Sequence, residues 1–204
     1  MATLDNMFAL KDLGKLNYFL GTQVQYLEHG FILNQSKYVD DMLQRICFSD
    51  LKSTASPNNL GKNLSINDGV PLTDPFLYRS TIGALQYITN TRLNITYMVN
   101  HISQFLKAST DAHWQATKRV LRYISGTKNY GLLFQPSHSL EVSAYSDVDW
   151  AANIDDRKLV VAYCVFVGGN LVSWSSKKQT AVARSSTESE YRALAHTTSE
   201  IIWL

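Results

Sequence analysis

The sequence contains little cysteine and proline, and its charges nearly cancel. Two cysteines in 204 residues, Cys47 and Cys164, are too few for a disulfide framework or a zinc cluster. Their apolar neighbours predict two reduced, buried thiols of an intracellular protein. Four Pro and ten Gly exclude a Pro/Gly-rich low-complexity segment. A formal net charge of +2 excludes a strongly basic chain, so any signal for nucleic acid must come from local clusters.

Long hydrophobic runs are also missing. The longest apolar stretch, residues 159–167, is about half of the roughly 18 residues that a membrane helix needs. The N-terminus has no basic segment leading into an apolar one, so we expect neither a secretory signal nor a membrane span. The last residues interrupt a periodic helix without a cap, so we expect the sequence to be cut from a longer domain.

The first two thirds of the sequence predict a hairpin, a linker and a helical layer. Residues 1–50 predict two strands around a Glu28-His29-Gly30 turn, then a short helix capped by Ser36. Residues 51–73 are rich in Ser, Asn, Gly and Pro and predict a linker. Residues 74–135 predict three antiparallel helices, because apolar residues recur there at helical spacing between capping residues.

The period changes to two in residues 136–204, which predict three antiparallel strands and a helix. Leu140, Val142 and Ala144 mark the apolar face of the first strand. The other two strands are joined through Gly168-Gly169. The helix begins at Ser185, with a capping box and the predicted apolar stripe Tyr191, Leu194, Ala195, Thr198, Ile201 and Ile202.

Acidic residues of this last segment are candidates for a cation site. Asp147 and Asp149 share one side of the first predicted strand, where two carboxylates suit a hard cation such as Mg²⁺. Glu190 is the freer carboxylate of the helix, because Glu188 belongs to the capping box. The alternative in each case is an ordinary solvated carboxylate.

A second acidic motif, Tyr38-Val39-Asp40-Asp41, spells the tetrapeptide of a polymerase's metal-binding hairpin. That chemistry requires the carboxylates at a tight turn between two strands. The predicted context here is a helix, whose first turns favour acidic residues in any case. We therefore do not assign polymerase chemistry to this motif.

Two basic clusters are candidates for nucleic-acid binding. They could follow a phosphate backbone, or they could be solvated faces that bind nothing. The clusters are Lys118, Arg119 and Arg122 in the third predicted helix, and Lys177, Lys178 and Arg184 before the last helix.

A series of sequence motifs resembles the Pol polyprotein of Copia-type retrotransposons, in order and over essentially the whole chain. The motifs are KDLGKLNYFLG (Lys11 to Gly21), YRSTIGALQYIT (Tyr78 to Thr89), HWQATKRVLRYISGT (His113 to Thr127), AYSDVDWA (Ala144 to Ala151), YCVFVGGNLVSWSSKKQTAVARSSTESEYRAL (Tyr163 to Leu194) and EIIWL.

The resemblance implies an α/β fold class: a reverse-transcriptase thumb and connection segment, then an incomplete RNase H-like domain of three antiparallel strands and its first helix. Residues 1–50 would be the thumb-like hairpin and helix, 51–73 a linker, 74–135 the helical connection and 136–204 the truncated RNase H-like domain. The chain departs from the family at residues 92–95, where Arg-Pro-Asp-Ile is usual, and at residues 156–163, where DRRSTSGY is usual.

The resemblance also implies a function and its residues. The parent activity would be RNA-templated DNA synthesis and Mg²⁺-dependent cleavage of RNA in RNA–DNA hybrids. Matching SDVDW and ESEYRAL to the family gives Asp147 and Glu190 as catalytic Mg²⁺ ligands of a two-metal site. A third carboxylate would follow the end of this chain, and the polymerase carboxylates would precede Lys11.

Such a fragment is expected to be inactive alone, with an RNA–DNA hybrid or other nucleic acid and the rest of the polyprotein as partners. The alternative is a non-catalytic nucleic-acid-binding relic or domesticated module.

Overall fold

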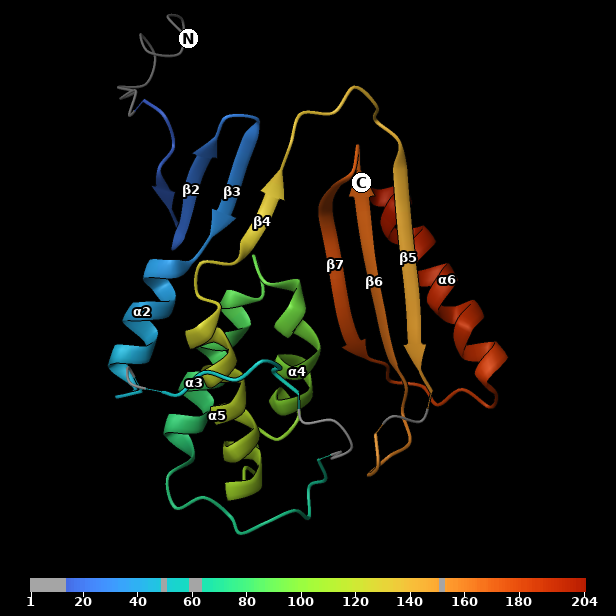
Figure 1. Cartoon of the computed structure of the whole chain (residues 1–204). Helices are drawn as coiled ribbons and strands as arrows, with labels where there is room; N and C mark the ends of the chain where they lie inside the picture. The colour runs from blue at the N-terminus through green and yellow to red at the C-terminus, as the bar shows by residue number, and fades with distance from the viewer. Residues whose placement is uncertain (1–13, 49–50, 59–63, 151–152) are drawn as a thin grey trace, which may run out of the picture.

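The computed structural model describes residues 14–48, 51–58, 64–150 and 153–204. Within these residues the chain is a mixed α/β structure with two antiparallel sheets and five helices (Figure 1). The expected α/β class is therefore confirmed at this level. Lys11 to Leu13, the start of the first family motif, lie outside the described residues.

The first sheet has the strand order β1-β2-β3-β4. Strands β2 (Thr22–Leu27) and β3 (Gly30–Asn34) form the predicted hairpin, and β1 (Tyr18–Phe19) pairs with β2. Strand β4 (Gly131–Phe134), which follows the helices, pairs with β3 and was not predicted. The rings of Phe31 and Phe134 stack across this pair at 5.2 Å. The sheet therefore unites segments from both sides of the predicted linker.

Helix α2 (Ser36–Arg45) follows the hairpin, but Ser36 does not cap it. Gln35 is the N-cap residue and its own side chain does not cap the helix, but the Gln23 side chain accepts from the Lys37 N–H at 2.9 Å. The Ser36 hydroxyl instead donates to Oδ1 of Asn34 at 2.9 Å, so Ser36 is the first residue inside the helix. The prediction of a Ser36 cap was wrong because the Ser36 hydroxyl acts as a donor to Asn34, the last residue of β3, and not as an acceptor for the helix N–H groups.

Helices α3 (Pro75–Ile88), α4 (Leu93–Ser103) and α5 (Asp111–Gly126) confirm the predicted helical layer. Asp74 caps α3 by accepting a hydrogen bond from the Phe76 N–H at 2.8 Å. The three helices share one hydrophobic core with α2, to which Val39, Met42 and Leu43 contribute. Leu64, from the predicted linker, is also buried in it. Residues on both sides of the linker are thus packed into a single unit.

The second sheet contains β5 (Val142–Asp149), β6 (Val160–Val167) and β7 (Asn170–Lys178), in that order. This confirms the three predicted antiparallel strands. Gly168 and Gly169 form the turn between β6 and β7 with φ angles of 56° and 79°, a region that favours glycine. Leu140 precedes β5 and is 84% exposed, so the apolar face predicted from Leu140 and Val142 is wrong.

Helix α6 (Ser186–Trp203) lies on one face of this sheet (Figure 1). It buries Ser189, Ala193 and Thr197, which recur every four residues. The predicted stripe is wrong: Tyr191 is 70% exposed and Ile202 is 81% exposed. A row of small side chains lets a helix approach a sheet closely, and the structure has this close packing in place of burial of the larger residues.

Neither cysteine is fully buried, contrary to the sequence prediction. Cys47 is exposed at the end of α2, with a φ angle of 56°, and Cys164 is half-buried in β6. The apolar neighbours of Cys47 pack into the core while its own side chain does not, because the backbone turns there to leave the helix.

Tyr78 contributes a buried hydrogen bond to the helical core. Its side chain is completely buried, and its hydroxyl donates to the Ile102 carbonyl at 2.6 Å, joining α3 to α4. Replacing Tyr78 with Phe should lower the free energy of unfolding by about 1–2 kcal/mol, because the hydrogen bond is lost. Urea denaturation checks this. Tyr191→Phe, at an exposed position, is the matched control and should change stability by less than about 0.5 kcal/mol. Equal stability of both variants would contradict the role of Tyr78.

Candidate nucleic-acid and metal sites

Asp147 lies on β5, an edge strand that pairs only with β6 within the described part of the chain. Its neighbour Val148 packs with Ala193 of α6, so alternation along the strand puts Asp147 and Asp149 on the opposite face. That face is turned toward α4: burial and then the Asp149 carboxylate raise the pKa of Tyr97. Asp147 is exposed, as the solvated alternative also requires.

Glu190 lies near the start of α6 and is exposed. The capping box predicted for Glu188 is confirmed in one half only, because its carboxylate bonds the Arg184 N–H and not the Ser185 N–H. The Glu188 N–H donates to the Ser185 hydroxyl at 3.1 Å, and its carboxylate accepts from the Arg184 N–H and pairs with Arg192. The Arg184 N–H and then Arg192 hold the pKa of Glu188 below its usual range. Glu190 has no such partner among the described residues.

Strand β5 ends and helix α6 begins at the same end of the second sheet (Figure 1). Asp147 is near the end of β5, and Glu190 is near the start of α6. Both are hard oxygen donors without a hydrogen bond or ion pair in the described ranges, so their chemistry fits Mg²⁺. No contact joins them, however: Asp147 lies on the face of the sheet away from α6, whereas Glu190 lies on α6 itself. The described residues contain no group of three His, Cys, Asp or Glu side chains able to hold a metal ion. A metal at this end would need further ligands.

Asp40 and Asp41 lie within α2, which confirms the helical context expected for the tetrapeptide. Asp40 forms an ion pair with Lys128 at 3.0 Å, and both side chains are about half exposed. The two carboxylates are therefore not placed in a turn between strands, and Asp40 links α2 to the end of α5.

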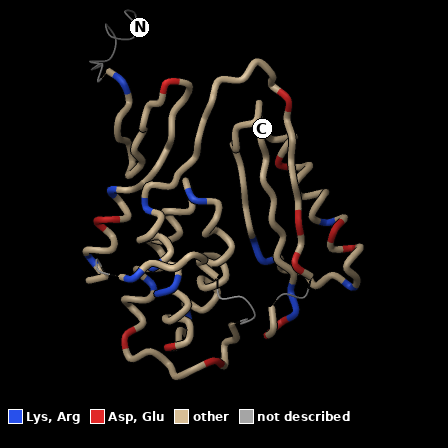
Figure 2. Tube along the Cα trace, viewed as in Figure 1, with Lys and Arg blue, Asp and Glu red and all other residues tan. Residues whose placement is uncertain are grey.

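The first basic cluster lies on α5 and contacts the segment that precedes α3, of which residues 51–58 and 64–74 are described. The Nε atom of Arg119 donates to the Asn58 carbonyl at 3.0 Å, and that of Arg122 to the Lys52 carbonyl at 2.8 Å. Lys118 lies over the rings of Phe48 and Trp114. Figure 2 shows this group of cations along α5 and the adjoining segment. These side chains therefore hold part of the predicted linker in place.

The three members of the second basic cluster differ in their surroundings. Lys177 is exposed on β7 and Arg184 is exposed before α6. Lys178 instead forms an ion pair with Asp156 at 2.9 Å and is only 23% exposed. Lys178 thus belongs to a contact inside the protein, and Lys177 and Arg184 are the members available to a ligand.

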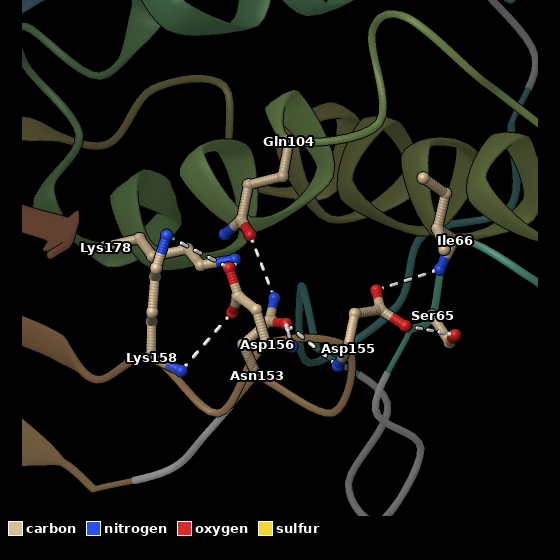
Figure 3. A network of polar contacts seen from close by, with 8 residues as sticks. All are labelled: Ser65, Ile66, Gln104, Asn153, Asp155, Asp156, Lys158 and Lys178. Atoms are coloured by element: carbon tan, nitrogen blue, oxygen red, sulfur yellow. Dashed lines mark hydrogen bonds and ion pairs between the residues drawn. The ribbon is translucent and has the colours of Figure 1, made fainter. Parts of the chain in front are cut away.

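The Asp156 contact is part of a polar network that joins the helical unit, made of the first sheet and helices α2 to α5, to the C-terminal unit, made of the second sheet and α6 (Figure 3). Asn153, 3% exposed, donates through Nδ2 to Gln104, the C-cap residue of α4, at 3.0 Å and accepts from the N–H groups of Asp155 and Asp156. The Asp155 carboxylate accepts from the Ser65 hydroxyl at 2.5 Å and from the Ile66 N–H at 3.0 Å.

Elsewhere along the joint, the Asn100 side chain of α4 donates to the Ser176 carbonyl of β7 at 2.6 Å. Nothing in the sequence predicted this joint, because its partners are far apart along the chain and no periodicity marks them.

None of the helices in the described ranges has the length and the apolar character that crossing a membrane requires.

Comparison with known proteins gives strong similarity over nearly the whole chain. It is 44% identical over 205 residues to the retrovirus-related Pol polyprotein from transposon RE1 of Arabidopsis thaliana, covering 99% of this chain and 14% of the polyprotein. Identity is 34% to the corresponding polyprotein from transposon TNT 1-94 of Nicotiana tabacum, over 98% of this chain and 16% of that relative. An uncharacterised mitochondrial protein of Arabidopsis thaliana is 42% identical, with 98% of this chain and 83% of that protein covered.

No protein-family model matches the chain, and no solved structure is significantly similar to it. The relatives nevertheless define the class: these are Pol polyproteins of retrovirus-related transposons. The chain belongs to this family, which confirms the resemblance of its sequence motifs to Copia-type Pol polyproteins. It spans about one seventh of the length of the polyproteins that it matches.

Asp156 should make the stability of the joint depend on pH. Burial acts to raise its pKa, but hydrogen bonding and charge from Lys178 and Lys158 hold the pKa below the usual 3.8. A carboxyl group with a lowered folded-state pKa stabilises fully above its unfolded pKa, and this stabilisation is lost as pH falls through the folded pKa.

The melting temperature should therefore fall less between about pH 6 and about pH 2 in Asp156→Asn than in the unmodified chain. Asp41→Asn, at an exposed position, should keep the unmodified pH dependence. Identical profiles for the chain and Asp156→Asn would contradict the role given to Lys178.

Proposed function

We propose that the chain is the part of a transposon Pol polyprotein in which the end of the reverse transcriptase, its thumb and connection, meets the first part of the RNase H domain. The main support is the alignment of 99% of the chain with only 14% of the RE1 polyprotein. Further support comes from the order of elements, a hairpin and helical unit followed by three antiparallel strands and a helix. The parent polyprotein would copy RNA into DNA and cut the RNA strand of the hybrid.

Asp147 and Glu190 are this segment's contribution to the proposed nuclease site. They are unpaired carboxylates at one end of the second sheet, and a divalent cation prefers oxygen ligands of this kind. Bound Mg²⁺ would supply an activated water and stabilise the leaving oxygen of the scissile phosphate. Two carboxylates are too few to hold a pair of ions, so the remaining ligands come from the rest of the polyprotein. We expect the chain alone to cut hybrids little or not at all.

A non-catalytic role in binding nucleic acid is the second candidate. Its support is a set of three cations without acidic partners among the described residues, namely Lys177 and the two arginines of α5. Such a module would hold a hybrid or duplex through its phosphates without cutting it. Hybrid cleavage in Mg²⁺ separates the two functions.

Joining the chain to the following segment of the RE1 polyprotein should create Mg²⁺-dependent cleavage of an RNA–DNA hybrid. Asp147→Asn or Glu190→Gln keeps the shape of the side chain and removes its charge. Either change should abolish cutting and leave hybrid binding nearly unchanged, because two-metal chemistry depends on each inner carboxylate. Cleavage of a labelled hybrid is the measurement, with a binding assay beside it.

The matched control is Asp40→Asn combined with Asp41→Asn, which removes two carboxylates from a helix of the other unit. Cutting by this variant should stay close to that of the joined protein. Undiminished cutting by Asp147→Asn would refute the site assignment, and a joined protein that never cuts would favour the binding module.

Binding of a labelled hybrid by the chain should weaken steeply with salt, because phosphate contacts release counterions. Three contacts would weaken it roughly 40-fold for a fourfold rise in salt. Lys177→Gln should lower the slope of log K against log salt by about one. Lys178→Gln should lower it less, because Lys178 is already paired with Asp156. Binding that is indifferent to salt would exclude the proposed contacts.

A further inference from the structure

A cavity of about 340 Å³ lies between α4, α5 and the segment that precedes α3. Its volume is within the range typical of small-molecule sites. The segment contributes apolar side chains such as Leu51, Pro57 and Leu64, while α4 contributes Tyr97, Met98 and His101. The wall is thus mixed, with apolar side chains beside a nearly equal share of polar and charged ones.

The α5 wall of the cavity carries an uncompensated positive charge. Lys118, Arg119 and Arg122 all line it, and no lining residue that the structure describes is acidic. None of the three forms an ion pair with a described carboxylate. Because like charges gathered at a concave surface repel one another, such a wall is the electrostatic complement of an anion.

Arg119 and Arg122 are held ready for such an anion. They are three residues apart on α5, so their side chains are neighbours on one helix face. The Nε atom of each donates to a backbone carbonyl of the segment, that of Asn58 or Lys52, which fixes the guanidinium group. Their terminal nitrogens have no hydrogen-bond partner among the described residues. Guanidinium nitrogens in this arrangement match the oxygens of a phosphate group, and fixing them beforehand lowers the entropic cost of binding.

The α4 side of the cavity contains two aromatic rings. Tyr97 and His101, one turn apart on α4, stack with ring centroids 6.0 Å apart and planes inclined by 11°. Burial, and next the charge of Lys178, lower the pKa of His101, so its ring is neutral at pH 7. A neutral aromatic pair offers a surface for a planar, weakly polar group.

We propose that this cavity binds a nucleoside phosphate, with the phosphate on Arg119 and Arg122 and the base against the Tyr97–His101 wall. The proposal goes beyond the function given above, which needs no small ligand and no pocket. The same chemistry is available from two sources, a free mononucleotide or the phosphorylated end of a nucleic-acid strand.

Calorimetric titration of the full chain with adenosine monophosphate tests the proposal, with adenosine as the ligand that lacks the phosphate. Adenosine monophosphate should bind saturably, and adenosine at least about tenfold more weakly, because charged hydrogen bonds are lost. Arg119→Gln and Arg122→Gln should each weaken binding of the nucleotide about tenfold or more.

Two further variants separate loss of the pocket from loss of the fold. Gln115→Trp adds bulk from an exposed lining position and keeps both arginines, so it should block the nucleotide while the circular dichroism spectrum stays unchanged. Arg79→Gln is the matched control, because Arg79 also donates through Nε to a backbone carbonyl, that of Leu106, but lies outside the cavity lining. It should bind like the unmodified chain.

Competition identifies the source of the phosphate. Displacement of adenosine monophosphate by a 5′-phosphorylated oligonucleotide, but not by its 5′-hydroxyl form, assigns the pocket to strand ends. Failure of both to displace it assigns the pocket to free nucleotides. Absence of saturable nucleotide binding, equal binding of adenosine, or equal loss in Arg79→Gln would overturn the proposal. The outcome of the hybrid-cleavage test with the joined protein does not depend on any of these results, so the two proposals can fail separately.

Discussion

Burial of apolar side chains in this chain is concentrated in the helical unit, and the C-terminal sheet depends on that unit for part of its order. The described core of α2, α3, α4 and α5 has sixteen buried hydrophobic residues, whereas the cluster between the second sheet and α6 has four. Each large side chain taken out of water contributes roughly 1.5–3 kcal/mol. Hydrophobic burial therefore contributes little to the stability of the C-terminal unit. Polar contacts with α4 and with the segment before α3 add to that stability.

These polar contacts form a continuous chain from the helical core to the sheet. His113 is completely buried, accepts from the Thr110 N–H through Nδ1, and has Nε2 at 3.0 Å from the Ser65 carbonyl. Ser65 in turn donates to Asp155, next to the loop residue Asn153 that reaches α4. A neutral imidazole can accept at one nitrogen and donate at the other, so a single side chain satisfies both ends of this connection. The segment predicted as a linker is thus a structural bridge.

The sequence predicted the elements whose signal is local and failed where the partner decides. Helices α3 to α5 and strands β5 to β7 followed from periodicity and turn residues alone. Strand β4 was missed because four residues with no alternation of their own become a strand only beside β3. The prediction of the buried face of α6 was wrong. Hydrophobic size predicted that Tyr191 and Leu194 would be buried, whereas the structure buries the small residues Ser189 and Ala193, which pack closely on the sheet. Sequence periodicity shows which residues are apolar, but it does not show how closely a helix approaches the sheet on which it packs.

The same distinction applies to the candidate sites. Glu188 could be given its capping role from sequence, because its partners lie within four residues. Nothing in the sequence pairs Lys178 with Asp156 or Arg119 with Asn58, since those partners are distant along the chain. A count of basic residues therefore treats as one class side chains that the fold divides into two kinds. Some, like Lys178, are neutralised by a carboxylate and strengthen the joint. Others, like Arg119 and Arg122, donate one hydrogen bond to a backbone carbonyl, and no carboxylate neutralises them. The same residues can therefore both order a loop and attract an anion.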